Sequence, residues 1–514
     1  MRERNPRNVL LICVDQMRAE HLGCVGHPNV RTPNLDRLAA RGIRFSNSYC
    51  NNPICMPART TMFTGLMQRD HGVRINGQQA HPGLHYLPQI FKDAGYRTHA
   101  AGKLHLTPYV PKLDQPDPQR FPEDLEAWNR GNFSEFTTPY FGFDTVDFVG
   151  GHTSFVFGEY IHWLKSKGGD PEMLKPNNAR KPACAAANCY RMALPAELHY
   201  NRYITDSTIR HIDSCAAENA SFFTFCSIPD PHFPVAPPAP YDTLYNPDDV
   251  KLPPPSETER LPPIYQQVHE GKIHPSGTDN SGLTEAKRRE MLALTFGMIT
   301  HLDTEIGRVL DTLDRHGLWE NTVVAFVSDH GDMMGDQGLL WKAFYTFDGC
   351  IRIPTIVAAP ETPGGLVSDS LICQMDLLPT LLDFADLPLP GSEWREKPTP
   401  FERGSVQPLN LLGGRSWRSL LSDPEKTIRD SVVIENDEPS TGLRPRCLVT
   451  PEFRLTVYAG QSWGEMFDRV KDPFERRNLW DDPKFQSTKA ALLQKLMDAY
   501  TQETPWLPIP PWNS

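Results

Sequence analysis

"NVLLICVDQ", residues 8–16, is the stretch that decides the fold. Residues 8–14 form a continuous apolar run, which is typical of a strand buried on both faces of a parallel sheet. The run ends at Asp15 and Gln16, so we expect these polar side chains at the edge where open α/β sheets hold their ligands. A second run, "TVVAFVS" at 322–328, also ends in polar residues: Asp329, His330, Gly331 and Asp332. The sequence therefore predicts that two distant strands bring acidic residues to the same kind of edge.

The chain alternates between helix and strand patterns around these two runs. "TPNLDRLAARG" (32–42) and "LPQIFKDAG" (87–95) are typical of helices, and a long helical pattern covers 285–316. Further strands are expected near 97–102 and at 221–228. This alternation predicts an α/β fold with a large doubly wound sheet, mixed and mostly parallel, flanked by helices, over residues 1–425.

The pattern changes from about residue 430. "DSVVIEN", "RCLVT" and "FRLTVYAG" read as short strands separated by turns, and "STKAALLQKLMDAYTQE" follows as a helix. They predict a smaller C-terminal subdomain, residues 426–514, with an antiparallel sheet and a terminal helix. The prolines of the last stretch, "TPWLPIPPWNS", exclude a helix there. It is expected either as an arm that grips a neighbouring subunit of a homo-oligomer or as a loosely packed end.

Two long segments, 108–200 and 229–282, are rich in Pro, Gly, Asn and aromatic residues and show weak periodicity. We interpret them as long loops. They either wall a binding site or are simple surface insertions.

Composition limits the classes of function. The chain has 514 residues, 39% of them hydrophobic and 22% charged, with a net charge of -11. These are ordinary values for a folded protein, and the negative charge disfavours general binding to nucleic acid or to an anionic membrane. The apolar run near the N-terminus is too short for a signal sequence, and no stretch reaches the length of a membrane span. We therefore expect a cytoplasmic enzyme.

The eleven cysteines form no compact framework, although the pairs Cys50/Cys55 and Cys184/Cys189 could each be a disulfide or half of a zinc site. Cys55 belongs to "NNPICMPARTTMFTG", residues 51–65, in which Pro57 suits the first turn of a helix that stops at Gly65. Cys55 is then expected at the helix entrance, where anions are favoured and thiol pKa values fall.

Arg59 lies one helical turn beyond Cys55 and can reach an anion there. A cysteine phosphatase loop would need its arginine six residues after the cysteine. That position is Thr61, so this interpretation is excluded.

The spacing Cys55-x-Pro57-x-Arg59 resembles the signature of the sulfatases, whose cysteine is oxidised to formylglycine. Further stretches resemble sulfatase segments in the order that the family has them, over about residues 8–480. These are "GYRTHAAGKLH" (95–105), His232-Phe233-Pro234, "SDHGDMMGDQGLLWK" (328–342), "QMDLLPTLLDFA" (374–385) and "EMFDRVKDPFERRNL" (465–479).

The resemblance implies one divalent metal ion. Asp15 and Asp329 offer the hard oxygen ligands that such an ion needs. The full set implied by the resemblance is Asp15, Gln16, Cys55 in its modified form, Asp329 and His330. Many sulfatases have Asp in place of Gln16, and Asn is common in place of His330. These differences move the site from a strict preference for calcium toward manganese, zinc or iron, so the identity of the metal stays open.

The resemblance also implies a mechanism. The formylglycine hydrate attacks sulfur or phosphorus with one oxygen and expels the anion through its second hydroxyl. Arg59 would steady this diol, His105 would be the base, and Lys103 would clamp a substrate oxygen. His232 and Lys342 would bind the ester oxygen and protonate the departing alcohol.

Other polar residues have weaker signals. Asn76, in "HGVRINGQ", is a candidate substrate contact, and a role in the Asn-Gly turn is the alternative. Histidines outside the motif matches are expected to be packing or surface residues: His27, His71, His85 and His99.

We expect a sulfuric ester hydrolase that acts like an arylsulfatase on a small anionic ester. The alternative is a phosphonate monoester or phosphodiester hydrolase with the same metal and formylglycine. Gln16, His330 and the "PAR" form of the signature resemble that branch, whereas Lys103 and His105 resemble sulfatases. A formylglycine-generating enzyme would be a partner during maturation. An unmodified Cys55 would instead indicate a non-catalytic anion-binding protein.

Overall fold

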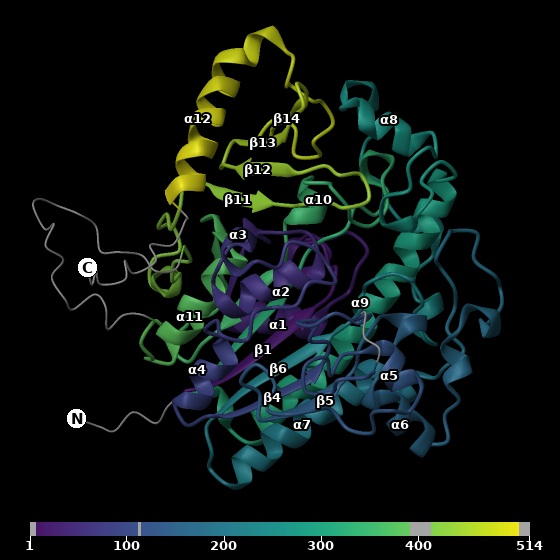
Figure 1. Ribbon diagram of the computed structural model, residues 1–514, viewed down its shortest axis with the longest axis vertical. Helices are drawn as coiled ribbons and strands as arrows, with labels where there is room; N and C mark the ends of the chain where they lie inside the picture. The colour runs from purple at the N-terminus through teal and green to yellow at the C-terminus, as the bar shows by residue number, and fades with distance from the viewer. Residues whose placement is uncertain (1–6, 112–114, 391–412, 503–514) are drawn as a thin grey trace, which may run out of the picture.

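A computed structural model of the protein describes residues 7–111, 115–390 and 413–502, and the predicted tail at 504–514 lies outside these ranges. The described residues form a large sheet with helices on both faces, and a smaller sheet stands beyond one edge of this body (Figure 1). None of the described helices has the length and apolar character needed to cross a membrane.

The main sheet has eight strands. Their order is β5 (Thr145–Phe148), β4 (Arg97–Gly102), β6 (Phe222–Ile228), β1 (Asn8–Val14), β7 (Thr322–Ser328), β8 (Thr355–Ala358), β2 (Ile43–Phe45) and β9 (Leu366–Ser368). β1 is central, fully buried, and parallel to both β6 and β7. β8 is antiparallel to both of its neighbours. The predicted mixed, mostly parallel sheet is confirmed.

Alternate residues of β1 pack into two hydrophobic cores, one on each face of the main sheet. Leu10, Ile12 and Val14 pack with helices α1 (Pro33–Arg41), α7 (Tyr200–Ala217) and α9 (Glu285–Arg315). Val9, Leu11 and Cys13 point to the opposite face, where α2 (Cys55–Thr64), α4 (Leu87–Asp93) and α11 (Leu377–Phe384) cover the sheet. Because a strand exposes successive side chains on opposite faces, the apolar run must be covered from both sides.

The segments predicted as loops contain regular structure that the sequence did not reveal. Residues 108–200 include α5 (Leu125–Asn129), α6 (Glu159–Ser166) and the edge strand β5, and residues 229–282 include α8 (Pro263–His269). β5 has four residues, of which only Phe148 is buried, so it lacks the period of a longer strand. The described parts of these segments are therefore not loops throughout, and short 3-10 helices join their elements.

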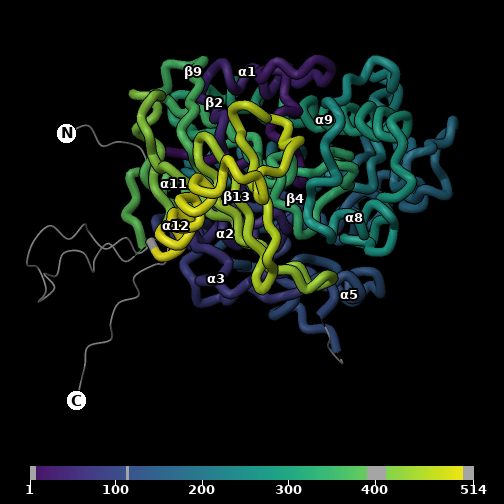
Figure 2. Tube along the Cα trace, turned by 90° about the horizontal axis from the view of Figure 1, so that it is seen from above, coloured from purple at the N-terminus to yellow at the C-terminus, as the bar shows by residue number. Residues whose placement is uncertain are grey.

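The C-terminal sheet is antiparallel, as predicted, and α12 (Gln486–Gln502) packs beside it (Figure 2). Its strands run in order along the chain: β11 (Val432–Glu435), β12 (Pro445–Val449), β13 (Phe453–Tyr458) and β14 (Gly464–Asp468). The boundary between residues 425 and 426 stays a prediction. Short elements complete the described structure: β3 (Ser48–Tyr49), β10 (Ile372–Cys373), α3 (Gln68–His71) and α10 (Asp348–Ile351).

A buried arginine connects the C-terminal sheet to the segment before α10. Arg454 on β13 is fully buried, ion-paired to Glu475 and, at 2.9 Å, to Glu465. Its guanidinium also donates to the hydroxyl of Thr346, which precedes α10, at 3.0 Å. Removing this cation leaves two buried carboxylates without their partner.

We expect Arg454→Ala to lower the free energy of unfolding by about 3–5 kcal/mol, because it leaves buried charges uncompensated. Urea denaturation followed by circular dichroism measures this. Lys471→Ala is the control, since the Lys471 side chain is 83% exposed. An Arg454→Ala protein as stable as this control would contradict the assignment.

Candidate active site

Helix α2 places Cys55 at its first residue. Ile54 has an extended backbone, Pro57 lies in the first turn, and Gly65 ends the helix with a φ of 66°. Every residue of α2 is buried, so the helix is a core element that aims its N-terminus into the protein. Cys55 itself is 1% exposed.

The ends of β1 and β7 deliver their carboxylates to this helix entrance. The backbone N–H of Asp329 donates to the Val14 carbonyl at 3.2 Å, which sets the two strand ends side by side. Gln16 has a φ of 67°, and its N–H donates to Asp329 Oδ1 at 3.1 Å. Cys55 Sγ lies 3.8 Å from Asp15 Oδ1. The structure thus brings together residues separated by up to 315 positions in the chain.

The same residues form a set of ligand atoms suited to a divalent cation. Asp15, Cys55, Asp329 and His330 each offer one ligand atom, and all four atoms lie within 4.8 Å of one another. The Gln16 amide nitrogen donates to Asp332, and its buried Oε1 has no hydrogen-bond partner among the described residues.

His330 is oriented for the same purpose. Its Nδ1 lies 2.9 Å from the Gly331 carbonyl, which keeps the ring proton there and leaves Nε2 facing the site. Carboxylate and amide oxygens with an imidazole nitrogen fit a divalent metal ion.

Three cationic side chains surround the carboxylates. Arg59 Nε donates to Asp329 at 2.9 Å, and its NH2 lies 3.5 Å from Asp15. Lys103 pairs with Asp15, and Lys342 Nζ lies 3.0 Å from Cys55 Sγ. Arg59, predicted to steady a diol at position 55, is therefore also the group that holds the two carboxylates together.

These cations determine the state of the thiol. Burial by itself raises the pKa of Cys55, but the nearby Lys103 and Lys342 ammonium groups, together with His330, hold that pKa well below its usual 9.0. All eleven cysteines are free, so neither Cys50/Cys55 nor Cys184/Cys189 forms the disulfide considered from the sequence. Position 55 is an anion-stabilising position at a helix N-terminus.

Two predicted histidines reach the same cluster. Burial lowers the pKa of His105 to about 3, and its neutral ring interacts with the Cys55 thiol. The backbone of His105 is held by Glu123, which accepts its N–H at 2.6 Å. His232 Nε2 lies 3.1 Å from Lys342 Nζ, while its Nδ1 lies 2.6 Å from the Phe233 carbonyl.

Asn76 lies at the surface, where its Oδ1 accepts the Met56 N–H at 3.1 Å. It therefore caps the first turn of α2, a role that was not considered from the sequence. Its contact with substrate stays a prediction.

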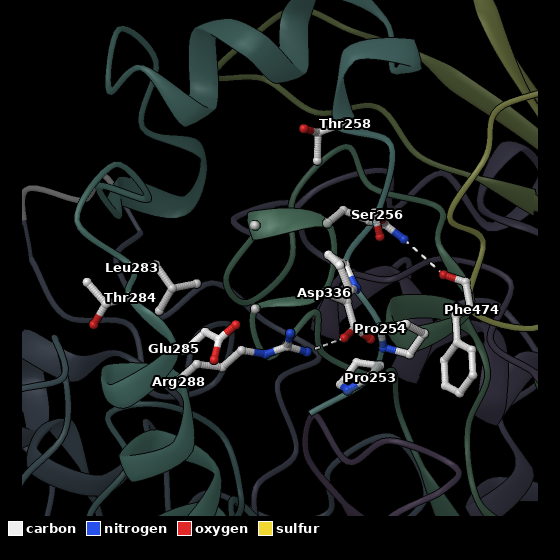
Figure 3. Close-up of a pocket in the computed structure, with 14 residues that line it drawn as sticks. Pro253, Pro254, Ser256, Thr258, Leu283, Thr284, Glu285, Arg288, Asp336 and Phe474 are labelled. Atoms are coloured by element: carbon white, nitrogen blue, oxygen red, sulfur yellow. Dashed lines mark hydrogen bonds and ion pairs between the residues drawn. The ribbon is translucent and has the colours of Figure 1, made fainter. Parts of the chain in front are cut away.

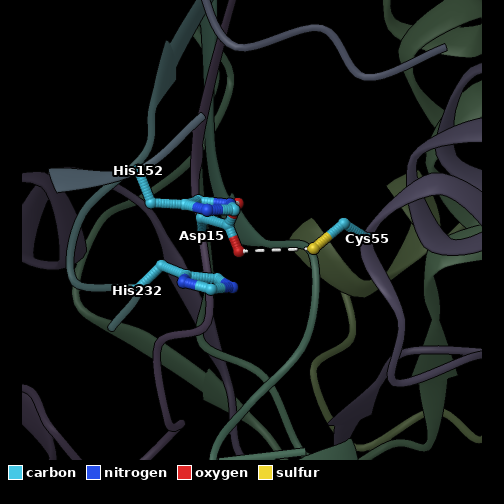
Figure 4. Close-up of side chains that lie close together, drawn as sticks. All are labelled: Asp15, Cys55, His152 and His232. Atoms are coloured by element: carbon cyan, nitrogen blue, oxygen red, sulfur yellow. Dashed lines mark hydrogen bonds and ion pairs between the residues drawn. The ribbon is translucent and has the colours of Figure 1, made fainter. Parts of the chain in front are cut away.

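Sequence reasoning missed His152 and Asp332 as members of the site. His152 stacks on His232, as Figure 4 shows, and belongs to a second ligand group with Asp15, Cys55 and His232. Nothing local in the sequence marks it. Asp332, in contrast, belongs to the polar run after β7, and that run could have identified it.

A separate buried group, His199, Asp230 and His301, also has ligand atoms within 4.8 Å of one another. However, His199 Nδ1 accepts the Asn201 N–H at 3.2 Å, which places the ring proton on Nε2. Asp230 is bound by the Tyr200 hydroxyl and, at 2.8 Å, by the Asn201 amide. Because a ligating imidazole nitrogen must be unprotonated, this group is a polar core network and not a metal site.

A cavity of about 250 Å³ lies between the segment that starts at Pro253, the start of α9 and the loop after β7 (Figure 3). Its lining includes Pro254, Leu283, Arg288, Asp336 and Phe474, and none of the site residues described above. Arg288 pairs with Asp336, which also pairs with Arg18 at 2.5 Å. This cavity is a neighbour of the polar loop after β7, and the chemistry belongs to the Cys55 cluster.

Comparisons with known proteins agree with this geometry. A family model described as Sulfatase matches residues 7–387. An arylsulfatase of Clostridium perfringens is 27% identical over 93% of this chain and 91% of its own length. The multifunctional alkaline phosphatase superfamily protein PehA of Trinickia caryophylli is 27% identical, over 96% and 94%. A solved phosphonate monoester hydrolase of Agrobacterium radiobacter superposes with a TM-score of 0.78 at 25% identity, covering 97% of this chain and 96% of that one.

We expect the purified protein to carry a single divalent ion per chain, bound beside Asp15. Asp329→Asn should lose it, because one carboxylate ligand is gone and Arg59 loses its partner. His199→Gln should retain it. Elemental analysis by mass spectrometry measures both variants, and retention by Asp329→Asn with loss by His199→Gln would reverse the assignment.

Chelation should lower the melting temperature of the wild type, since the ion binds only the folded chain.

Proposed function

The chain belongs to the sulfatase family, and from this premise we propose that it hydrolyses sulfate monoesters, as an arylsulfatase does, through a formylglycine formed from Cys55. The observation that carries the proposal is the set of ligand atoms from Asp15, Cys55, Asp329 and His330 within 4.8 Å. Lys103 and Lys342 lie beside this set, so an anionic ester would find positive charge around the reacting position.

Hydration of an aldehyde at position 55 gives two hydroxyl groups on one carbon. One hydroxyl attacks sulfur and displaces the alcohol, which leaves a sulfate ester at position 55, and loss of the proton from the other hydroxyl then expels sulfate and restores the aldehyde. A serine would instead form a stable ester that needs water to cleave it. A divalent ion held by Asp15, Gln16, Asp329 and His330 would supply Lewis acidity at this position. A formylglycine-generating enzyme is the partner that such a modification requires.

The neighbouring side chains suit the proton transfers. His105, neutral because burial lowers its pKa to about 3, can take the proton from the second hydroxyl. Lys342 Nζ lies 3.1 Å from His232 Nε2 and 3.0 Å from Cys55 Sγ, so this pair can bind the ester oxygen and protonate the alcohol as it leaves. Lys103 is placed to hold a non-bridging oxygen of the ester.

A second candidate keeps the same residues and changes the substrate to a phosphonate monoester or a phosphodiester. Gln16 and His330 in the metal group support it, and so does the superposition on a phosphonate monoester hydrolase with a TM-score of 0.78. Aryl sulfates and phosphonate monoesters both carry a single negative charge, so charge alone does not separate them. The presence of both Lys103 and His105 favours the sulfate ester.

We expect kcat/KM to be at least about tenfold higher for 4-nitrophenyl sulfate than for the 4-nitrophenyl ester of phenylphosphonate, a difference of about 1.4 kcal/mol in transition-state binding. Steady-state kinetics on metal-loaded protein provides the comparison. Peptide mapping must first show aldehyde at position 55, and Cys55→Ala is the inactive control. A preference for the phosphonate ester would replace the first candidate with the second.

We expect His232→Ala to lower kcat by about 10²- to 10⁴-fold, because general acid catalysis contributes that much. The loss should grow as the leaving alcohol becomes less acidic, from nitrophenol to phenol, since the protonated alcohol is the product of this step. His85→Ala, at an exposed position, is the control. An equal loss for every leaving group would place His232 elsewhere in the reaction.

A further inference from the structure

His152 contacts two residues of the proposed reaction centre, Lys103 and His232. Its ring lies parallel to that of His232, with centroids 3.5 Å apart and 5° between the planes (Figure 4). Its Nε2 lies 2.5 Å from Lys103 Nζ and 3.6 Å from Asp15 Oδ2. The His152 imidazole therefore contacts Lys103 through its edge and His232 through its face.

The backbone holds this ring in place. Gly151 and Thr153 on either side have φ values of 74° and 46°, a conformation that is costly for Thr153 unless its surroundings fix it. The Thr153 hydroxyl donates to the Pro234 carbonyl at 2.7 Å, which ties this turn to the segment that carries His232. The two rings are consequently fixed relative to each other by the main chain as well as by stacking.

The contact with His152 restricts the orientation of the Lys103 ammonium group. An ammonium group has three N–H donors in a tetrahedral arrangement. Asp15 accepts one of them and His152 Nε2 accepts a second, so the direction of the third is determined. Since Lys103 is fully buried, it has no freedom to choose other partners in water.

His152 is also the member of this group nearest to solvent. Its side chain is 19% exposed, whereas those of Asp15 and Lys103 are 0% exposed. Because Nε2 accepts from Lys103, the ring proton resides on Nδ1. His152 is therefore the more solvent-accessible partner of the buried Lys103–Asp15 pair.

We propose that His152 is a positioning residue for ester hydrolysis, a role that rests on the function proposed above. Its Nε2 directs the third N–H of Lys103 toward a substrate oxygen, and its face keeps the His232 ring oriented toward the leaving oxygen. Two substitutions separate these effects. His152→Phe keeps the aromatic face and removes the acceptor, and His152→Gln keeps an acceptor and removes the face.

For His152→Phe we expect kcat/KM to fall by about 10- to 100-fold for all leaving groups alike, the equivalent of losing one charge-assisted hydrogen bond. For His152→Gln we expect a fall that grows from 4-nitrophenyl to phenyl esters, as for His232→Ala. The series is measured on whichever ester class the wild type hydrolyses. His162→Phe, at an exposed position of α6, is the matched control.

A double-mutant cycle separates positioning from a merely structural role. On a Lys103→Ala background, His152→Phe should cost less than threefold, because the lysine that it directs is already gone. Metal content and melting temperature should match the wild type within error. Equal losses on both backgrounds, or single variants within twofold of the wild type, would overturn the proposal.

Calorimetric titration with inorganic sulfate tests the inference without turnover. We expect His152→Phe to weaken sulfate binding about tenfold and His152→Gln to change it less than threefold. If this pattern holds while the wild type hydrolyses no ester, the proposed function fails, and what stands is that His152 directs Lys103 toward a bound anion. If turnover is normal and sulfate binds equally to all variants, the positioning role fails and the proposed function stands.

Discussion

The ion pairs of one buried arginine are the interaction on which the rest of this structure depends. Asp15 and Asp329 end adjacent strands, and both are removed from water, so their carboxylates would repel each other in a medium that screens charge poorly. Arg59 reaches both of them from α2, the helix whose first residue is Cys55. A single guanidinium thereby fixes the position of the helix entrance relative to both strand ends, which the backbone pairing of β1 with β7 already holds side by side. Packing alone would not determine that position, because every residue of α2 is buried and its polar and apolar residues are not segregated into separate faces.

The local charge around position 55 runs opposite to that of the whole chain. The protein carries a net charge of -11, yet Arg59, Lys103 and Lys342 all converge near Cys55 and outnumber Asp15 and Asp329. Three buried cations are tolerable only because each is bound by carboxylates, by backbone oxygen or by imidazole nitrogen. The surplus of positive charge is available to an incoming anion, and the low pKa of the thiol is the same effect seen on a resident group.

The sequence predicted those parts of the molecule that local patterns encode. β1 and β7 are uniform apolar runs, their terminal acids follow directly, and the start of α2 has its proline and its glycine stop. β5 and α7 were missed, the first because four half-exposed residues have no period, the second because its buried face includes Asn, Thr and Ser among apolar residues. The place of His152 in the site could not be predicted from the sequence, for a different reason. Its partners Lys103 and His232 lie 49 and 80 residues away, and only the order of strands β5, β4 and β6, which these three residues follow, brings them together. The bridging of two carboxylates by Arg59 likewise depends on strand order, which no motif records.

The ligand group combines residues from Asp15 near the start of the chain to His330 after β7, and this has a consequence for how the protein is made. A chain emerging from the ribosome cannot assemble the group until β7 and the loop after it have left the exit tunnel. Cys55 is buried in the folded protein, but it is synthesised early and stays accessible to other proteins through most of translation. The long interval between its synthesis and its burial would give the proposed formylglycine-generating enzyme time to act, and a chain that folded first would keep a buried thiol.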